Sequence, residues 1–304
     1  QTTAEAEIEK EKLNVDMYAL NSRVNDLYFG ILLLDEQLKQ NALLQDELER
    51  NYRQITAYVE NGIANQADLD AVKVEQLNTK QKRVELVSSR MAYLKMLSLL
   101  VGEKLSQETV LEKPVPQDDI SAVGEIRRPE LSLFNAQGVG LQVQEKALNV
   151  RHLPQFGLFV QGAYGNPGLN MLKNEFSPYY IAGVRLSWNF GSLYTLKNDR
   201  KVIENKRRQL DNNRDVFLFN TRLEMTQQDQ AIQSLEKQMQ DDDEIIRLRT
   251  NIRKSAEAKV ANGTLTVTEM LRELTNESLA RQSKALHEIQ RLMGIYQLKY
   301  TTND

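Results

Sequence analysis

The chain has 304 residues, a net charge of −3 from 39 basic and 42 acidic side chains, and no cysteine. The balanced charge excludes a bulk attraction to nucleic acid, and the lack of cysteine excludes disulfides and thiolate metal sites. Because only 41% of the residues are hydrophobic and 7% aromatic, burial is predicted to follow stripes along long helices rather than to fill compact cores.

The first hundred residues have the pattern of a helical hairpin. Asn61-Gly62 is predicted to end the first helix and Gly102 the second, because glycine adopts the left-handed conformation that closes a helix. A sustained 3.5-residue period is typical of a coiled coil. Here apolar positions keep that period, interrupted only at Asn41 and Gln45: Leu20, Val24, Leu27, Ile31, Leu34, Leu38, Leu48, Tyr52, Ile55 and Val59. The longest aliphatic run, residues 31–34, is too short to span a membrane.

Residues 103–128 are predicted to form an irregular connector with a short strand at Val110 and Leu111, because turn-forming residues interrupt any longer element. Pro129 is expected to open a new helix that runs to about Arg151, since proline suits the first helical turn.

Between residues 154 and 191 the period changes to two. Two stretches of about ten residues alternate apolar with polar or small side chains, with Phe159 as the exception, and aromatic residues gather at their ends. This length and alternation are typical of membrane β-barrel strands. The face expected to meet lipid carries Phe156, Leu158, Val160, Val184, Leu186 and Trp188. The alternative is an amphipathic hairpin that lies on the core of a soluble protein.

The C-terminal part repeats the hairpin pattern. No proline or glycine occurs from Leu193 to Asn262, so about 70 residues are predicted to run as one helix that ends at Asn262-Gly263. Gly62 and Gly263 are 201 residues apart, which indicates duplication of a large unit. Counterparts of the two strands would then precede residue 1. Since two strands cannot close a barrel, the chain is expected to be a fragment without its N-terminal strands.

The ordered set of motifs resembles the TolC-type outer-membrane efflux proteins, the outer membrane factor family. "RRPEL" at 127–131 resembles the Arg-Pro-Asp/Glu-Leu start of that family's helix before the barrel, and "LPQFGLFVQGAYG" and "GVRLSWNFG" follow at the expected distance. The segments "NGIANQADL" and "NGTLTVTEML" resemble the family's two periplasmic helix turns.

This resemblance implies a mainly α fold with a small β part: long antiparallel coiled-coil hairpins of an α-barrel, plus two strands of a transmembrane β-barrel. It divides the chain into a first periplasmic helical hairpin (1–102), an equatorial connector (103–128), a helix leading to the barrel (129–153), two outer-membrane strands with an extracellular loop (154–191) and a second periplasmic helical hairpin (192–304). It further implies a homotrimer in the outer membrane of a Gram-negative bacterium, in contact with its lipid, with the helices in the periplasm.

The function implied by the resemblance is that of an exit duct. Such a channel belongs to a tripartite efflux or type I secretion system and passively conducts substrates that an inner-membrane pump passes on through a periplasmic adaptor (membrane fusion) protein. The adaptor contacts carry over to the two helix turns, at Gly62, Ile63, Ala64, Gly263, Thr264, Leu265 and Thr266.

The family's periplasmic gate carries over to Asp68, Glu269 and Arg272. Three copies of Glu269 around an axis would form a negative ring that favours cations. Arg272 stands where the family has a second acid, and Leu265 stands where some relatives have a basic residue. Asp68 and Glu269 are equally expected as carboxylates that stabilise helix N-termini through the helix dipole.

Neither an enzyme nor a cofactor is predicted. No nucleophile, base and orienting group recur in a recognisable pattern, and no glycine-rich phosphate loop precedes a helix. His152 and His287 are far apart and lack a ligand pattern, so no metal site is expected. The alternative function is that of a soluble structural coiled-coil protein without a membrane role, which the heptads fit equally well.

Overall fold

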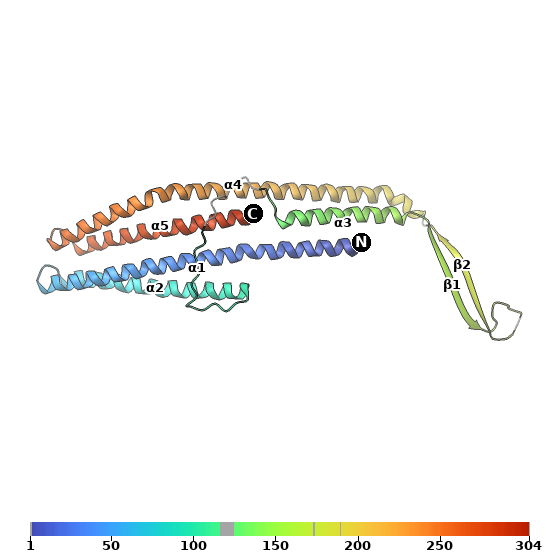
Figure 1. Ribbon diagram of the computed structural model, residues 1–304, viewed down its shortest axis with the longest axis horizontal. Helices are drawn as coiled ribbons and strands as arrows, with labels where there is room; N and C mark the ends of the chain where they lie inside the picture. Colours follow the sequence, from blue (N-terminus) through green and yellow to red (C-terminus); the bar gives the residue numbers. More distant parts are fainter. Residues whose placement is uncertain (1, 116–124, 173, 189, 304) are drawn as a thin grey trace. The chain divides into compact units, whose positions relative to one another are not determined.

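The computed structural model describes residues 2–115, 125–172, 174–188 and 190–303, apart from the side chains of residues 192 and 193. Its elements in chain order are α1 (Thr2–Glu60), α2 (Gln66–Val101), α3 (Pro129–Arg151), β1 (Gln155–Gly165), β2 (Ser177–Ser187), α4 (Gly191–Ala261) and α5 (Val267–Thr302) (Figure 1). The predicted mainly α fold with a small β part is therefore confirmed, including the uninterrupted helix α4 of 71 residues.

The chain splits into two compact units. Residues 16–128 and 218–304 form one, which we call the hairpin unit, and residues 1–15 and 129–217 form the other, the strand unit. Each unit is described by itself below. No helix within the described ranges is both long enough and apolar enough to cross a membrane.

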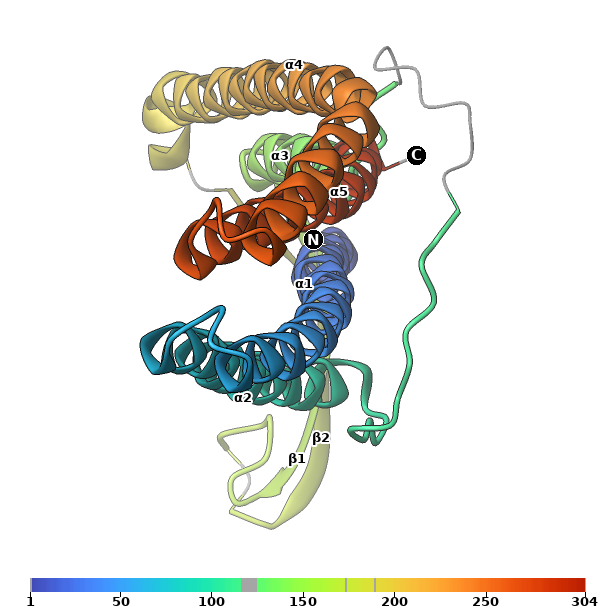
Figure 2. The ribbon, with the colours of Figure 1, turned by 90° about the vertical axis from the view of Figure 1, so that its left-hand side faces the viewer.

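The hairpin unit consists of two antiparallel helical hairpins, α1 with α2 and α4 with α5, whose turns lie at the same end of the unit (Figure 2). All four helices contribute to one apolar cluster next to the turns: Leu48, Ile55, Val72, Ala256, Val260, Val267, Met270, Leu271 and Leu274. Burial of each large aliphatic side chain contributes about 1.5–3 kcal/mol. The predicted side-by-side packing of long helices is thus confirmed, and the two hairpins share a core at the turns.

Three glycines end helices where the sequence predicted it. Gly62, Gly102 and Gly263 have φ values of 72°, 73° and 67°, which lie in the left-handed region. The Gly62 and Gly263 amides donate to the carbonyls of Val59 and Val260 at 3.0 and 2.9 Å. These bonds satisfy carbonyls that the end of a helix otherwise leaves without a partner.

The interruption of the apolar pattern in α1 is a buried polar layer. Asn41 is buried, and its Nδ2 donates to the carbonyl oxygen of Thr79 on α2 at 3.0 Å. Gln45 Nε2 donates to Asn41 Oδ1 at 3.1 Å and approaches the same carbonyl at 3.4 Å. A buried amide in a coiled coil favours one register because other registers leave it without partners.

The connector after α2 is held by a buried arginine. Arg90 on α2 pairs with Asp35 on α1, and its two terminal nitrogens donate to the carbonyls of Gln107 and Thr109 at 2.8 and 2.7 Å. The short strand expected at Val110 and Leu111 is wrong, because no strand of the described residues lies beside this segment to pair with it. Instead, Leu111 packs against the apolar clusters around Ile31 and Phe29. Residues 116–124 of the connector lie outside the described residues.

The end of the connector is fixed between α1 and α5. The Arg127 amide donates to the carbonyl of Thr302 at 2.8 Å, and Asn303 Nδ2 donates back to the Arg127 carbonyl at 2.8 Å. The guanidinium of Arg128 lies 5.6 and 5.4 Å from the ring centroids of Tyr18 and Tyr300, which stack on each other. Such cation–π contacts add to the attachment of this segment.

In the strand unit, α3 packs along the first part of α4. Phe134 and Phe217 lie 5.9 Å apart between ring centroids, and Arg207 pairs with Glu145 at 2.9 Å. The helix begins at Pro129 and ends at Arg151, as predicted.

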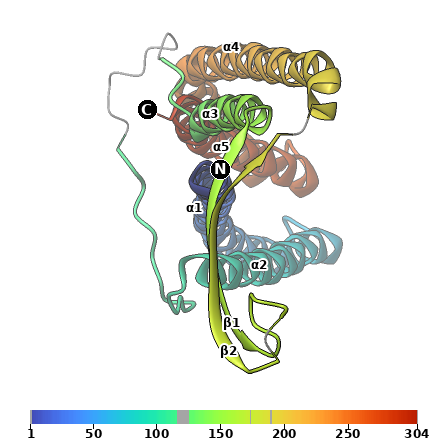
Figure 3. The ribbon, with the colours of Figure 1, turned by 90° about the vertical axis from the view of Figure 1, so that its right-hand side faces the viewer.

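Strands β1 and β2 form a two-stranded antiparallel sheet, seen as a long twisted ribbon in Figure 3. The register pairs Phe156 with Leu186 and Leu158 with Val184. Directly opposite residues of an antiparallel pair share one face of the sheet. The alternation expected from the sequence therefore produces a single apolar face that includes both strands.

Candidate functional site

The two hairpin turns are built in the same way. In the first turn the Asn65 side chain accepts a hydrogen bond from the Asp68 amide at 3.0 Å, and the Asp68 carboxylate accepts one from the Asn65 amide at 3.1 Å. In the second turn Thr266 Oγ1 accepts from the Glu269 amide at 3.2 Å, and the Glu269 carboxylate accepts from the Thr266 amide at 3.2 Å. Both are capping boxes, in which two otherwise unpaired amides at a helix start are satisfied reciprocally.

Glu269 and Asp68 therefore serve as helix caps, one of the two roles that the sequence left open. The pKa of Glu269 lies below its usual value, because the Thr266 amide and hydroxyl both donate to the carboxylate and Arg272 adds a positive charge nearby. Arg272 itself contacts Glu273 at 3.5 Å. The Glu269 carboxylate is thus ionised at neutral pH, and its hydrogen bonds fix its direction.

The seven residues expected to contact an adaptor do not all point outward. Ala64 and Leu265 are half-buried and pack against the apolar cluster of all four helices. The other five are exposed, at positions Gly62, Ile63, Gly263, Thr264 and Thr266. Ile63 is the large apolar side chain among them, and 53% of its surface is exposed. Each turn thus has one residue that packs against the apolar cluster and others that are exposed to solvent.

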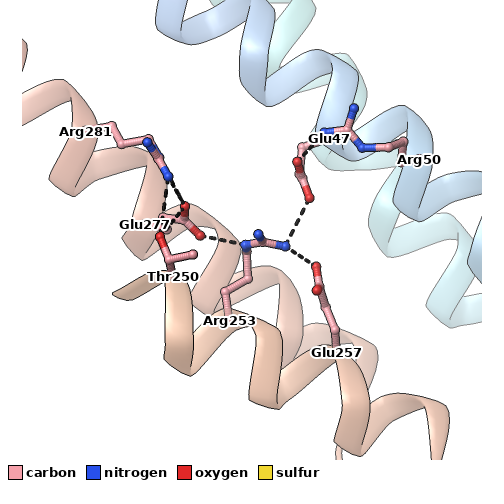
Figure 4. Close-up of polar contacts among 7 residues, drawn as sticks. All are labelled: Glu47, Arg50, Thr250, Arg253, Glu257, Glu277 and Arg281. Carbon is pink, nitrogen blue, oxygen red and sulfur yellow. Dashed lines mark hydrogen bonds and ion pairs between the residues drawn. The ribbon is translucent and has the colours of Figure 1, made fainter. Parts of the chain in front are cut away.

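A charged cluster that the sequence reasoning missed joins the two hairpins (Figure 4). Arg253 on α4 reaches Glu47 on α1 at 3.1 Å and Glu277 on α5 at 2.6 Å, and it also pairs with Glu257 on its own helix. Only 13% of the Arg253 side chain and 7% of the Glu277 side chain are exposed. The four-residue spacing from Arg253 to Glu257 is visible in the sequence, whereas the contact with Glu47 crosses 206 residues and is not.

Glu277 is the most enclosed carboxylate of this cluster. It accepts hydrogen bonds from Thr250 Oγ1 at 2.8 Å and from Arg281 at 2.6 Å, in addition to Arg253. Burial by itself raises the pKa of Glu277, but the hydrogen bonds from Arg281, Arg253 and Thr250 outweigh it, so the pKa lies below its usual value. A cleft of about 280 Å³ adjoins the cluster and is lined by α1, α4 and α5. The contact between the hairpins at this level is therefore polar rather than close-packed.

The apolar face of the sheet is strongly exposed. Phe156, Leu158 and Val160 are 74–86% exposed, and Val184 and Leu186 on the partner strand share their face. Trp188 differs from the other predicted lipid-facing residues, because it follows the end of β2 and its Nε1 donates to the carbonyl of His152 at 3.2 Å. A contiguous exposed apolar face of this kind marks a surface that lipid or protein covers.

No group of three or more carboxylates and histidines in the described part of the chain is placed to hold a metal ion. His287 instead contacts Asp242 across the α4–α5 pair, at 2.9 Å between Nδ1 and Oδ2. The candidate site therefore has three features: the two hairpin turns, the Arg253 ion-pair cluster and the exposed apolar face of β1 and β2. They define a class of proteins that combine long helical hairpins with a pair of amphipathic strands.

This architecture is similar to that of solved outer-membrane proteins, although no sequence comparison finds a match. No protein-family model matches the sequence, and no curated protein matches it. The crystal structure of the outer membrane protein VceC from Vibrio cholerae matches with a TM-score of 0.75 at 14% identity, over 98% of this chain and 71% of that chain. The CmeC outer membrane channel of Campylobacter jejuni matches with 0.72 at 13% identity, over 97% and 66%. CusC matches with 0.76 at 16% identity, over 99% and 73%.

The chain thus has the fold of the TolC-type outer-membrane channels, as its motifs predicted. It spans between 66% and 73% of the length of these three structures. The matched structures are outer-membrane proteins and channels rather than enzymes, in agreement with the prediction that this chain is not an enzyme. At this level of identity the likeness is one of fold.

Proposed function

We propose that the chain is the larger part of an outer-membrane exit duct for efflux, through which substrates pass without chemistry. The observation that carries this proposal is the exposed apolar face of β1 and β2 on a TolC-type fold. Lipid covers such a face at low cost, and each strand has the ten or so residues that a tilted membrane strand needs. If the chain were instead a soluble coiled-coil protein, this apolar face would be exposed to water.

The segments then take the roles that the fold suggests. Residues 1–102 and 192–304 are periplasmic hairpins, 103–128 is an equatorial connector, 129–153 leads to the barrel, and 154–191 crosses the outer membrane of a Gram-negative bacterium. Strands β1 and β2 have free edges, which are not tolerated in hydrocarbon, so further strands must close the barrel. A homotrimer supplies part of them by repetition of the protomer.

The helices carry exposed apolar stripes that suit this assembly. Ile245, Leu248 and Ile252 on α4 follow the three- and four-residue spacing of a coiled coil and are 45–47% exposed. On α2, Val74 and Leu77 are exposed as well. We assign these stripes to contacts between neighbouring protomers of the α-barrel.

The hairpin turns are the docking surface for a periplasmic adaptor, which in turn joins an inner-membrane pump. Ile63 is an exposed apolar anchor, and the exposed residues Gly62, Gly263 and Thr264 allow a partner to approach the backbone closely. Ala64 and Leu265 support the turns from beneath, and Thr266 caps the following helix.

The gate lies at the same end of the hairpins. Three copies of Glu269, with Asp68 and Arg272 nearby, set the charge at the opening, and the Arg253 cluster holds each second hairpin to its first. Opening of the duct requires the hairpins to part at the turns, so the contact between Arg253 and Glu47 is one of those that have to break.

Conductance of the full-length protein in planar lipid bilayers tests the proposal. Stepwise current increases in wild-type samples, abolished by heat denaturation of the protein before addition, are the expected result. A folded protein that inserts into no bilayer and remains in the soluble fraction of cells contradicts the channel assignment and favours the soluble coiled-coil alternative.

A further inference from the structure

Arg185 is the one charged side chain in the sequences of β1 and β2. The register places it opposite Gly157, on the face that also carries Phe159 and Gly183 and not on the exposed apolar face. A guanidinium on the lipid face of a membrane strand costs about 2–4 kcal/mol near the bilayer centre, so its position on the other face is the one that a membrane strand requires.

Arg185 lies against an aromatic ring. Its guanidinium carbon is 5.5 Å from the centroid of the Phe159 ring. Phe159 is 36% exposed, well below the 74% or more of its apolar neighbours on the opposite face of β1, Phe156, Leu158 and Val160. This contact explains why a phenylalanine interrupts the polar side of the alternating pattern in β1: the ring supports a cation.

Two glycines make the arrangement possible. A β-carbon at Gly183 would lie 2.9 Å from two ring carbons of Phe159, so only glycine lets the ring lie flat across β2. A β-carbon at Gly157, opposite Arg185, would meet no atom within 4 Å. The guanidinium is thus supported from one side by Phe159 and left uncovered on the other.

No carboxylate of the described residues is placed to neutralise Arg185. Its N–H groups remain available, and a guanidinium binds carboxylates, sulfonates and phosphates through paired hydrogen bonds. A stacked arginine without a carboxylate partner among the described residues, on the sheet face opposite the exposed apolar one, suits anion recognition rather than a structural ion pair.

We propose that Arg185, supported by Phe159 and Gly183, forms a positive ring inside the β-barrel that favours the passage of anions, including organic cargo that bears a carboxylate, sulfonate or phosphate. The inference rests on the proposed function, because the ring requires the trimer to place one copy of Arg185 per protomer around a lumen. Salt sets the distance over which the positive ring acts on ions in the lumen, because the Debye length is about 30 Å at 0.01 M salt and about 3 Å at 1 M.

The test is the reversal potential of the full-length protein in planar bilayers under a KCl gradient, at a mean concentration of about 0.01 M and again at about 1 M. Arg185→Gln is expected to lower the chloride-to-potassium permeability ratio at low salt by roughly two-fold or more. At high salt the variant and the wild type are expected to agree. Arg185→Lys keeps the charge and should retain most of the wild-type ratio, and Gln161→Ala, on the same face, should leave it unchanged.

The outcomes separate the two proposals. A conducting pore whose permeability ratio is the same in wild type and Arg185→Gln at low salt overturns the ring and leaves the exit duct intact. A wild-type protein that forms no pore overturns the exit duct and the ring with it. If Arg185→Gln fails to insert, 1,3-benzenedisulfonate applied to the wild-type pore decides: reduced current in its presence supports the ring, and unchanged current at low salt overturns it.

Discussion

Arg253 Nη1 lies 3.1 Å from Glu47 Oε1, and this contact ties the second hairpin to the first. Arg253→Gln removes the positive charge shared by Glu47, Glu257 and Glu277. Arg281 still pairs with Glu277, and Arg50 with Glu47. Loss of one partner from a largely buried cluster is expected to cost about 2 kcal/mol and to lower the midpoint of thermal unfolding by about 5 °C. Circular dichroism of the full-length protein in detergent measures the shift.

Arg247 offers the matched control on the same helix. It pairs with Glu244 at the surface, where side chains are mostly exposed, so Arg247→Gln should leave the midpoint almost unchanged. If the Arg253 cluster also helps to keep the duct closed, as proposed above, Arg253→Gln raises the open probability of the channel in bilayers and Arg247→Gln does not. Equal thermal midpoints for the two variants would show that the Arg253 cluster contributes nothing to holding the hairpins together.

Acid weakens the hairpin unit through Glu277. Because its pKa is lowered in the folded protein from the usual 4.5, the ionised carboxylate stabilises the fold above that value, and the stabilisation is lost as pH falls through the lower folded pKa. Wild-type stability should therefore decline below about pH 4.5, more steeply than that of Glu277→Gln. Unfolding curves at pH 7 and below pH 4 measure this. Parallel declines of the two proteins would contradict the role of Glu277.

Charge and capping can be separated at the second turn. Glutamine also serves as the partner in a capping box, so Glu269→Gln should preserve thermal stability. Because it removes the negative ring at the periplasmic opening, it should raise the chloride-to-potassium permeability ratio of the pore. Thr266→Ala should do the opposite, with a loss of about 1 kcal/mol and unchanged ion preference. A fall in stability with Glu269→Gln and no change in ion preference would restrict Glu269 to its capping role.

Two buried asparagines on α1 should respond differently to leucine. Asn51 Nδ2 is buried without a hydrogen-bond partner among the described residues, whereas Asn41 Nδ2 donates to Thr79. Asn51→Leu removes an unsatisfied donor and should stabilise the protein by about 1 kcal/mol or more. Asn41→Leu should destabilise the protein by about 1 kcal/mol or more, since it takes away the partner of Gln45 Nε2 and of the Thr79 carbonyl. Thermal midpoints in the reverse order would refute this account of the polar layer.

The sequence predicted the elements whose signals are local. Gly62, Gly102 and Gly263 marked helix ends, and the two-residue period at 155–187 marked the strands, because backbone preference and periodicity depend on neighbouring residues. The strand at Val110 and Leu111 was predicted wrongly, since nothing in the sequence showed that Arg90 binds the connector carbonyls.

The candidate site was only partly visible for the same reason. The turn residues lie within short sequence motifs, so their positions could be predicted from the resemblance to the family. The capping role of Asp68 and Glu269 could be predicted from their residue type at the start of a helix. The Arg253 cluster depends on three helices that meet in space, and the support of Arg185 by Phe159 depends on strand register. Register and helix packing become definite only in the folded chain.

The central claim is that the apolar face of β1 and β2 lies against lipid. Residues 1–304 contain no cysteine. In a cysteine-free form of the full-length protein in bilayers, nitroxide labels can be attached at single positions through Leu158→Cys, Val184→Cys, Gln161→Cys and Ser187→Cys. The account predicts high collision rates with oxygen at 158 and 184 and with a water-soluble nickel chelate at 161 and 187. Labels at 158 and 184 that are reached by the nickel chelate as readily as those at 161 and 187 would contradict it.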